Sequence, residues 1–206
     1  MTVNDTDFDS SACGGSLISK DYVLTVAHCI EGLKKSSISL IAGLHGVPSF
    51  LQLIQELDKQ QWRSVKQIYT HLQYDSVTFH NDIALLQLDT PFTFNNYVQP
   101  VCLPGADPEL GDEVIMIAYT EVIGPCDIWF QSVDNSKQIC VANLFDGSSA
   151  CFGDSGGPLL TQQQGQYVVS GVSINIQSCN TKRDDSFSNV FTRVSTYKTW
   201  IKSIVG

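Results

Sequence analysis

Ser155 lies among glycines in the segment Cys151–Leu160, CFGDSGGPLL, with a carboxylate, Asp154, directly before it. A serine hydroxyl is a weak nucleophile, so catalysis needs a base beside the oxygen and donors for the oxyanion that develops. The glycines allow a sharp turn in which the N–H groups of Gly153 and Ser155 can point at a substrate carbonyl. The pentapeptide GDSGG alone is equally compatible with a tight glycine turn that carries an incidental serine.

GDSGG also matches the G-x-S-x-G elbow of α/β-hydrolases, in which the histidine follows the serine along the chain. The four histidines of this chain all precede Ser155: His28, His45, His71 and His80. This order argues against an esterase, and the chain also lacks the helix–strand alternation of that fold.

Two segments supply a base and a carboxylate, in that order, before the serine. The word LTVAHC contains His28, and HNDIALLQL places Asp82 at the start of a buried strand. A carboxylate there can accept the imidazole N–H, fix the tautomer and stabilise the imidazolium. Taken singly, His28 is a core histidine and Asp82 a cap at a strand start. Their joint occurrence in one order favours a hydrolase with a serine nucleophile.

Short β-rich segments separated by turn residues must position these groups. The predicted strands are 37–44, 82–88, 113–118, 167–174 and 189–194. One helix is predicted from about Thr196 to the end, because Tyr197, Trp200, Ile201 and Ile204 form an apolar stripe. The pattern predicts an all-β barrel or sandwich with a C-terminal helix, and a crossing between two halves at 100–108.

The composition excludes several classes of protein. A net charge of −9 argues against a nucleic-acid partner, and no apolar run approaches the length of a membrane span. Seven scattered cysteines indicate an oxidising compartment and not a zinc site. The N-terminus nevertheless lacks the basic start and apolar core of a signal peptide.

From Cys13 almost to Gly206, the chain resembles the chymotrypsin-like (trypsin-fold) serine proteases. The words that carry the resemblance are CGGSLIS, LTVAHC, NDIALL, VCLP, CFGDSGGPL and NVFTRVSTYKTWI. This resemblance implies an all-β fold of two antiparallel β-barrels with a C-terminal helix. The expected single peptidase domain, 1–206, comprises an N-terminal barrel (1–100) with His28 and Asp82, and a C-terminal barrel (101–206) with Ser155 and the helix.

The resemblance implies a serine endopeptidase that works through an acyl-enzyme and needs no cofactor or metal. His28 is then the general base, Asp82 the orienting carboxylate and Ser155 the nucleophile. Gly153 and Ser155 supply the oxyanion N–H groups, and Ser173 hydrogen-bonds Asp82. The expected partners are polypeptide substrates and protein inhibitors, with no nucleic acid and no membrane.

The cysteines also fit the family. Spacing alone does not choose among the many pairings, but the family pattern selects Cys13–Cys29, Cys126–Cys140 and Cys151–Cys179. Cys102 is left over, at a position that many two-chain members tie to a propeptide cysteine. The resemblance therefore predicts a secreted protease made as a zymogen, with a missing propeptide linked to Cys102. If the protein is secreted, Asn4 in NDT is a glycosylation sequon.

The match departs from the family in two places. The chain has no IVGG-like terminus, so the first strand and the activation peptide are expected to be absent. Residues 118–120, AYT, stand where family members carry Gly-Trp-Gly. The segment from there to Cys126 is shorter than in the family by about one β-hairpin. This predicts a shortened second barrel that is open or weakly closed. A catalytically silent protease-fold binding module, a zymogen-like form or a truncated fragment therefore stands as the alternative.

The expected substrate pocket is neutral and narrow. Ser149 stands where trypsin-like members carry an aspartate, so selectivity for arginine or lysine is not expected. Asn175 and Asn189 stand where glycines usually keep the pocket walls clear, and Ile174 replaces the usual tryptophan. Such a pocket favours small or medium uncharged side chains, without selecting a single residue.

Overall fold

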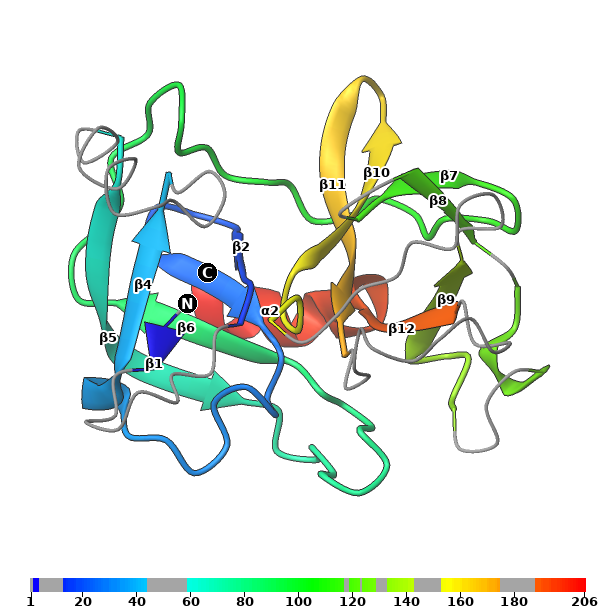
Figure 1. Ribbon diagram of the computed structural model, residues 1–206, viewed down its shortest axis with the longest axis horizontal. Helices are drawn as coiled ribbons and strands as arrows, with labels where there is room; N and C mark the ends of the chain where they lie inside the picture. The colour runs from blue at the N-terminus through cyan, green and yellow to red at the C-terminus, as the bar shows by residue number, and fades with distance from the viewer. Residues whose placement is uncertain are drawn as a thin grey trace.

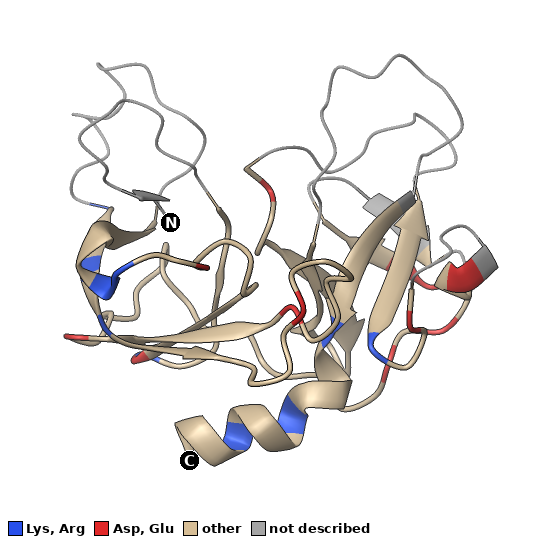
Figure 2. Cartoon of the chain, turned by 90° about the horizontal axis from the view of Figure 1, so that it is seen from below, with Lys and Arg blue, Asp and Glu red and all other residues tan. Residues whose placement is uncertain are grey.

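The computed structural model describes residues 2–3, 13–43, 59–116, 119–122, 124–128, 133–142, 153–174 and 188–206. Their strands form two antiparallel sheets, one from each half of the chain, which lie side by side (Figure 1). Charged residues are dispersed over both halves (Figure 2). None of the helices in these residues is long and apolar enough to cross a membrane.

The N-terminal sheet has the strand order β1-β4-β5-β6-β3-β2. These strands are β1 (Thr2–Val3), β2 (Ser16–Leu17), β3 (Tyr22–Thr25), β4 (Ile38–Ala42), β5 (Gln61–Thr70) and β6 (Ala84–Leu88). Fully buried leucines and isoleucines on β3, β4 and β6, including Leu24, Leu85 and Leu86, fill its core. Ladder hydrogen bonds join β3 to β6, the two strands next to His28 and Asp82, and burial of this apolar surface stabilises the pair.

The C-terminal sheet closes into a barrel in the order β10-β11-β12-β9-β8-β7. Its strands are β7 (Glu113–Ile115), β8 (Tyr119–Val122), β9 (Gln138–Ala142), β10 (Pro158–Gln163), β11 (Gln166–Ser173) and β12 (Ser188–Arg193). The closing contact, between β7 and β10, has one register pair, Ile115 opposite Leu160. The second barrel is therefore closed and not open, and its closure is weak because one register pair makes it.

The chain ends in a 3-10 helix, η3 (Val194–Tyr197), and the α-helix α2 (Lys198–Val205). Tyr197 and Ile201 are buried in the core of the N-terminal sheet, and the Tyr22 hydroxyl donates to the Ile204 carbonyl at 3.3 Å. The C-terminal segment thus returns to the N-terminal half (Figure 1). This architecture confirms the predicted all-β, two-barrel fold with a C-terminal helix.

Candidate active site

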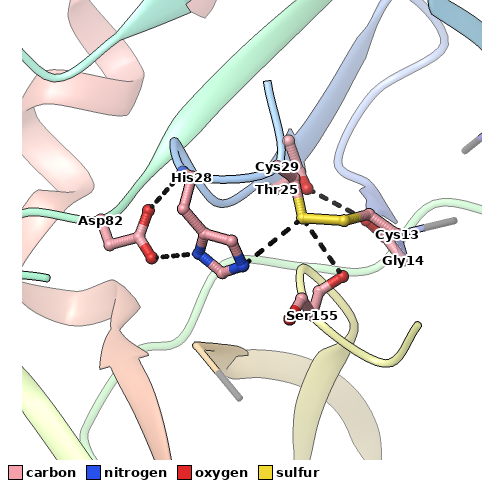
Figure 3. The surroundings of a disulfide bond; sticks show 7 residues. All are labelled: Cys13, Gly14, Thr25, His28, Cys29, Asp82 and Ser155. Atoms are coloured by element: carbon pink, nitrogen blue, oxygen red, sulfur yellow. Dashed lines mark hydrogen bonds and ion pairs between the residues drawn. A yellow bond between two sulfur atoms is a disulfide. The ribbon is translucent and has the colours of Figure 1, made fainter. Parts of the chain in front are cut away.

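Three turns at strand ends carry the predicted catalytic side chains. His28 follows β3, Asp82 precedes β6, and Ser155 precedes β10. Strands β3 and β6 are paired up to Thr25 opposite Ala84, so the turns that hold His28 and Asp82 emerge side by side. Figure 3 shows the imidazole between the carboxylate on one side and the serine turn on the other.

Asp82 binds His28 through both of its carboxylate oxygens. Oδ2 lies 2.6 Å from the His28 Nδ1, and Oδ1 accepts the backbone N–H of His28 at 2.9 Å. The Asp82 side chain is fully buried, whereas the His28 side chain is 18% exposed. A buried carboxylate is stable only with such donors. Because Nδ1 faces the carboxylate, Nε2 is the nitrogen that remains to exchange a proton elsewhere.

The Cys13–Cys29 disulfide lies between the histidine and the serine turn. Nε2 of His28 is 3.7 Å from the Cys29 Sγ, and the Ser155 carbonyl oxygen is 3.8 Å from the same sulfur (Figure 3). The Ser155 carbonyl also accepts the N–H of Gly14 at 2.7 Å. The disulfide and this hydrogen bond therefore hold the serine turn against the segment that carries His28.

The glycines of the serine turn are required by close contacts. Gly156 has φ +81°, and a Cβ there would lie 2.3 Å from the Thr25 Oγ1 and 2.4 Å from the Gly14 carbonyl oxygen. The Gly156 N–H donates to the Ser173 carbonyl at 2.8 Å, which ties the turn to the end of β11. Ser155 is 7% exposed, and the turn therefore presents it from a confined position.

Two side chains that were not among the predicted site residues also contact the turn at Asp82. Thr192 of β12 donates its hydroxyl to the Asp82 carbonyl at 2.7 Å. The Tyr197 hydroxyl donates to the Asn81 Oδ1 at 3.1 Å. Threonine and tyrosine carry no signal for such a role in a single sequence, because both are also ordinary residues of strands and cores.

Aromatic side chains flank the His28–Asp82 pair. The Phe79 ring meets the His28 ring edge to face, with centroids 5.8 Å apart. The Tyr74 hydroxyl donates to the Glu31 Oε2 at 3.4 Å. Burial, followed by the negative charges of Asp82 and Glu31, raises the pKa of Tyr74 well above its usual value. Tyr74 therefore stays a neutral donor at physiological pH.

The remaining predicted residues have different outcomes. A second disulfide joins Cys126 to Cys140, and Cys102 is an exposed free thiol. Gly153 is exposed in the serine turn, whereas Ser173, Ile174 and Asn189 are buried. Asn4, Ser149, Cys151, Asn175 and Cys179 lie outside the described residues.

Comparison with known proteins places the chain among proteases. The trypsin family model matches residues 2–201. Chymotrypsin-like elastase family member 1 of Felis catus is 33% identical over 94% of this chain and 78% of that protein. Serine protease filzig of Drosophila melanogaster is 30% identical over 97% of this chain. Suppressor of tumorigenicity 14 protein homolog of Bos taurus is 29% identical over 94% of it.

The chain spans only 13% of the length of the fly protein and 25% of the cattle protein. These two relatives thus match it through one part of a longer chain, whereas the cat protein matches over most of its length. The family match over residues 2–201 agrees with the two-barrel fold and with the words that flank His28, Asp82 and Ser155. The chain belongs to the trypsin family of chymotrypsin-like serine proteases.

Proposed function

We propose that this chain is a serine endopeptidase in which His28, Asp82 and Ser155 form the catalytic triad. The observation that carries the proposal is the 2.6 Å contact between the His28 Nδ1 and the fully buried Asp82 carboxylate. A carboxylate in this place orients the imidazole and stabilises the imidazolium that forms during acyl transfer. Nε2 of His28 and the Ser155 carbonyl oxygen lie 3.7 and 3.8 Å from the same sulfur, Cys29 Sγ. The serine turn is therefore close to Nε2, which supports Ser155 as the nucleophile.

The reaction proceeds in two halves. Nε2 of His28 takes the Ser155 hydroxyl proton while the oxygen bonds to the substrate carbonyl carbon, which gives a tetrahedral oxyanion. The imidazolium then gives that proton to the leaving amine as the C–N bond breaks, and an acyl-enzyme remains. Water attacks the ester by the same proton route and releases Ser155. Asp82 stays ionised throughout, because its role is to stabilise His28 and not to carry the proton.

The oxyanion is stabilised by the N–H groups of Gly153 and Ser155, and Ser173 supports Asp82. Preorganised donors of this kind lower the barrier because they need no rearrangement during the reaction. The hydrogen bonds that Gly14 and Gly156 donate around the serine turn support this assignment, since they fix the backbone from which the donors project.

The substrate is a polypeptide with a small or medium uncharged side chain before the scissile bond. Ser149, Ile174, Asn175 and Asn189 form the pocket, and none of them carries a charge that would select arginine or lysine. The Ile174 N–H donates to the carbonyl of Val190, the residue after Asn189, at 3.0 Å, and this proximity supports a pocket wall that Ile174 and Asn189 share.

The protein acts outside the cell, where protein inhibitors are further partners. Two disulfides support an oxidising compartment. Cys102 is the attachment point for a propeptide cysteine. Its exposure and the open groove of about 470 Å³ beside it, lined in part by Leu17, Pro158 and Tyr167, support this attachment.

Hydrolysis of internally quenched peptides that differ only before the scissile bond tests the proposed function. We expect cleavage of peptides with alanine, valine or leucine there, slower cleavage with arginine, and no cleavage by Ser155→Ala. A folded wild-type protein that cleaves none of these peptides would favour the catalytically silent alternative. Equal or faster cleavage after arginine would contradict the proposed pocket and leave the triad standing.

A further inference from the structure

The backbone directly before β6 adopts an unusual conformation at Asn81. Asn81 has φ +56°, a left-handed conformation that asparagine tolerates better than most residues. Its carbonyl accepts the N–H of Ile83 at 2.9 Å, which closes a γ-turn across Asp82. This turn sets the direction in which the Asp82 side chain leaves the backbone.

The Asn81 side chain is bonded at both ends of its amide. Nδ2 donates to the Gln73 carbonyl at 2.7 Å, and Oδ1 accepts the Tyr197 hydroxyl at 3.1 Å. Asn81 is 8% exposed and Tyr197 is 4% exposed, so water does not readily replace either partner. The next carbonyl, that of Asp82, accepts the Thr192 hydroxyl at 2.7 Å.

These partners come from a different part of the chain than Asp82. Thr192 lies on β12 of the C-terminal barrel, and Tyr197 ends η3 where the chain returns to the N-terminal sheet. We infer that Asn81, Tyr197 and Thr192 are positioning residues, which hold the Asp82 turn so that its carboxylate meets His28. The inference rests on the proposed function, because it gives the C-terminal segment control over the geometry of the proposed triad.

The surroundings of Tyr197 favour a fixed donor. Its ring lies edge to face with His71, at a centroid distance of 5.4 Å, and His71 also contacts Trp200 of α2 at 5.5 Å. Burial, then the charges of Asp134 and Asp82, raises the pKa of Tyr197 to about 12. The Tyr197 hydroxyl therefore keeps its proton at neutral and mildly alkaline pH.

Tyr197→Phe removes this hydroxyl and keeps the ring. Tyr22→Phe is the matched control, because the Tyr22 hydroxyl also bonds to the C-terminal segment, at the Ile204 carbonyl, but does not touch the Asp82 turn. The first readout is the downfield proton NMR resonance of the Nδ1 proton between His28 and Asp82. The second is the rate at which a fluorophosphonate labels Ser155 at pH 7.5.

We expect Tyr197→Phe to broaden or shift this resonance and to slow labelling roughly 10-fold or more, since small displacements of catalytic groups have effects of this size. Tyr22→Phe should change neither readout, and it should lower the melting temperature less than Tyr197→Phe does, because Tyr22 is only partly buried. The same behaviour in both variants would overturn the inference, because the hydroxyl would then have only a structural role.

Two further substitutions test the same turn if Tyr197→Phe folds poorly. Thr192→Val should slow labelling and shift the resonance, and Thr192→Ser, which keeps the hydroxyl, should restore both. Asn81→Gly permits the left-handed backbone without the side-chain bonds, so it separates conformation from hydrogen bonding. An unchanged resonance in Thr192→Val and Asn81→Gly would overturn the inference.

The resonance also separates failure of the inference from failure of the proposed function. If the wild-type protein is not labelled at all, the proposed function fails for this chain. The NMR comparison of Tyr197→Phe with Tyr22→Phe still decides whether the C-terminal segment positions Asp82, because that comparison requires no activity.

Discussion

Replacement of Gly156 by alanine should damage the serine turn far more than the same change at Gly165. Both glycines have left-handed φ values, +81° for Gly156 and +77° for Gly165. An added Cβ at Gly165, in the hairpin between β10 and β11, would meet nothing within 4 Å. At Gly156 it would lie 2.3 Å from the Thr25 Oγ1 and 2.4 Å from the Gly14 carbonyl oxygen. The pair therefore separates backbone strain from steric conflict.

The expected magnitudes follow from these contacts. A left-handed alanine costs about 1–2 kcal/mol, which is the whole effect expected at Gly165. Overpacking against backbone that cannot move freely adds about 1–3 kcal/mol at Gly156. For a chain of this size each kcal/mol lowers the melting temperature by about 2–4 °C, so Gly156→Ala should melt well below Gly165→Ala.

Thermal denaturation of both variants, followed by circular dichroism, gives the stability difference. Fluorophosphonate labelling at 20 °C then reports the serine turn, since the Gly14 N–H bonds the Ser155 carbonyl and must shift to admit the new Cβ. We expect Gly156→Ala to lose most labelling while folded and Gly165→Ala to label like the wild type. Equal melting temperatures, or full labelling of Gly156→Ala, would show that the turn can accept a Cβ at Gly156.

Three further perturbations have defined outcomes. Asp82→Asn keeps the size of the side chain but removes the charge that His28 contacts, so labelling of folded protein should slow by roughly 10³- to 10⁴-fold; a normal rate would contradict the role of Asp82. Burial, then the charge of Lys137, lowers the pKa of His71 below 6.5, so folding favours the neutral ring. The free energy of unfolding should therefore be highest above pH 6.5 and should decline as the pH falls toward the lowered pKa of His71. The urea midpoints at pH 7.5 and pH 5 should differ less in His71→Gln than in the wild type, and an equal difference in both proteins would contradict this role of His71. Maleimide should label native, unreduced protein at the exposed Cys102, and Cys102→Ser should abolish labelling; residual labelling would show that another pair is reduced.

The sequence predicted five strands whose apolar residues recur, and the structure contains each of them, as β4, β6, β7, β11 and β12. Among the strands that were not predicted is β5, the longest strand in the described residues, because Gln61–Thr70 has one buried residue, Val65, and no apolar alternation. That strand is held by its pairing with β4 and β6 on either side. Long-range pairing of this kind leaves little signal in a local pattern.

The His28–Asp82 contact could be anticipated from short sequence motifs, because catalysis by a serine nucleophile requires a histidine and a carboxylate next to particular strands. The supporting contacts could not. Thr192 and Tyr197 meet the Asp82 turn from more than a hundred residues away, and only the folded chain brings them together. The weak closure of the second barrel by Ile115 and Leu160 likewise depends on register, which composition does not specify.

The most direct test of the central claim is fluorophosphonate labelling of the purified chain, with the adduct located by mass spectrometry. The probe phosphonylates a serine only when a neighbouring base has activated it. We expect one adduct, on Ser155, in the wild-type protein, and none in Ser155→Ala or His28→Ala of equal folded content. A folded wild-type protein without an adduct, or an adduct that persists in His28→Ala, would contradict a triad of His28, Asp82 and Ser155.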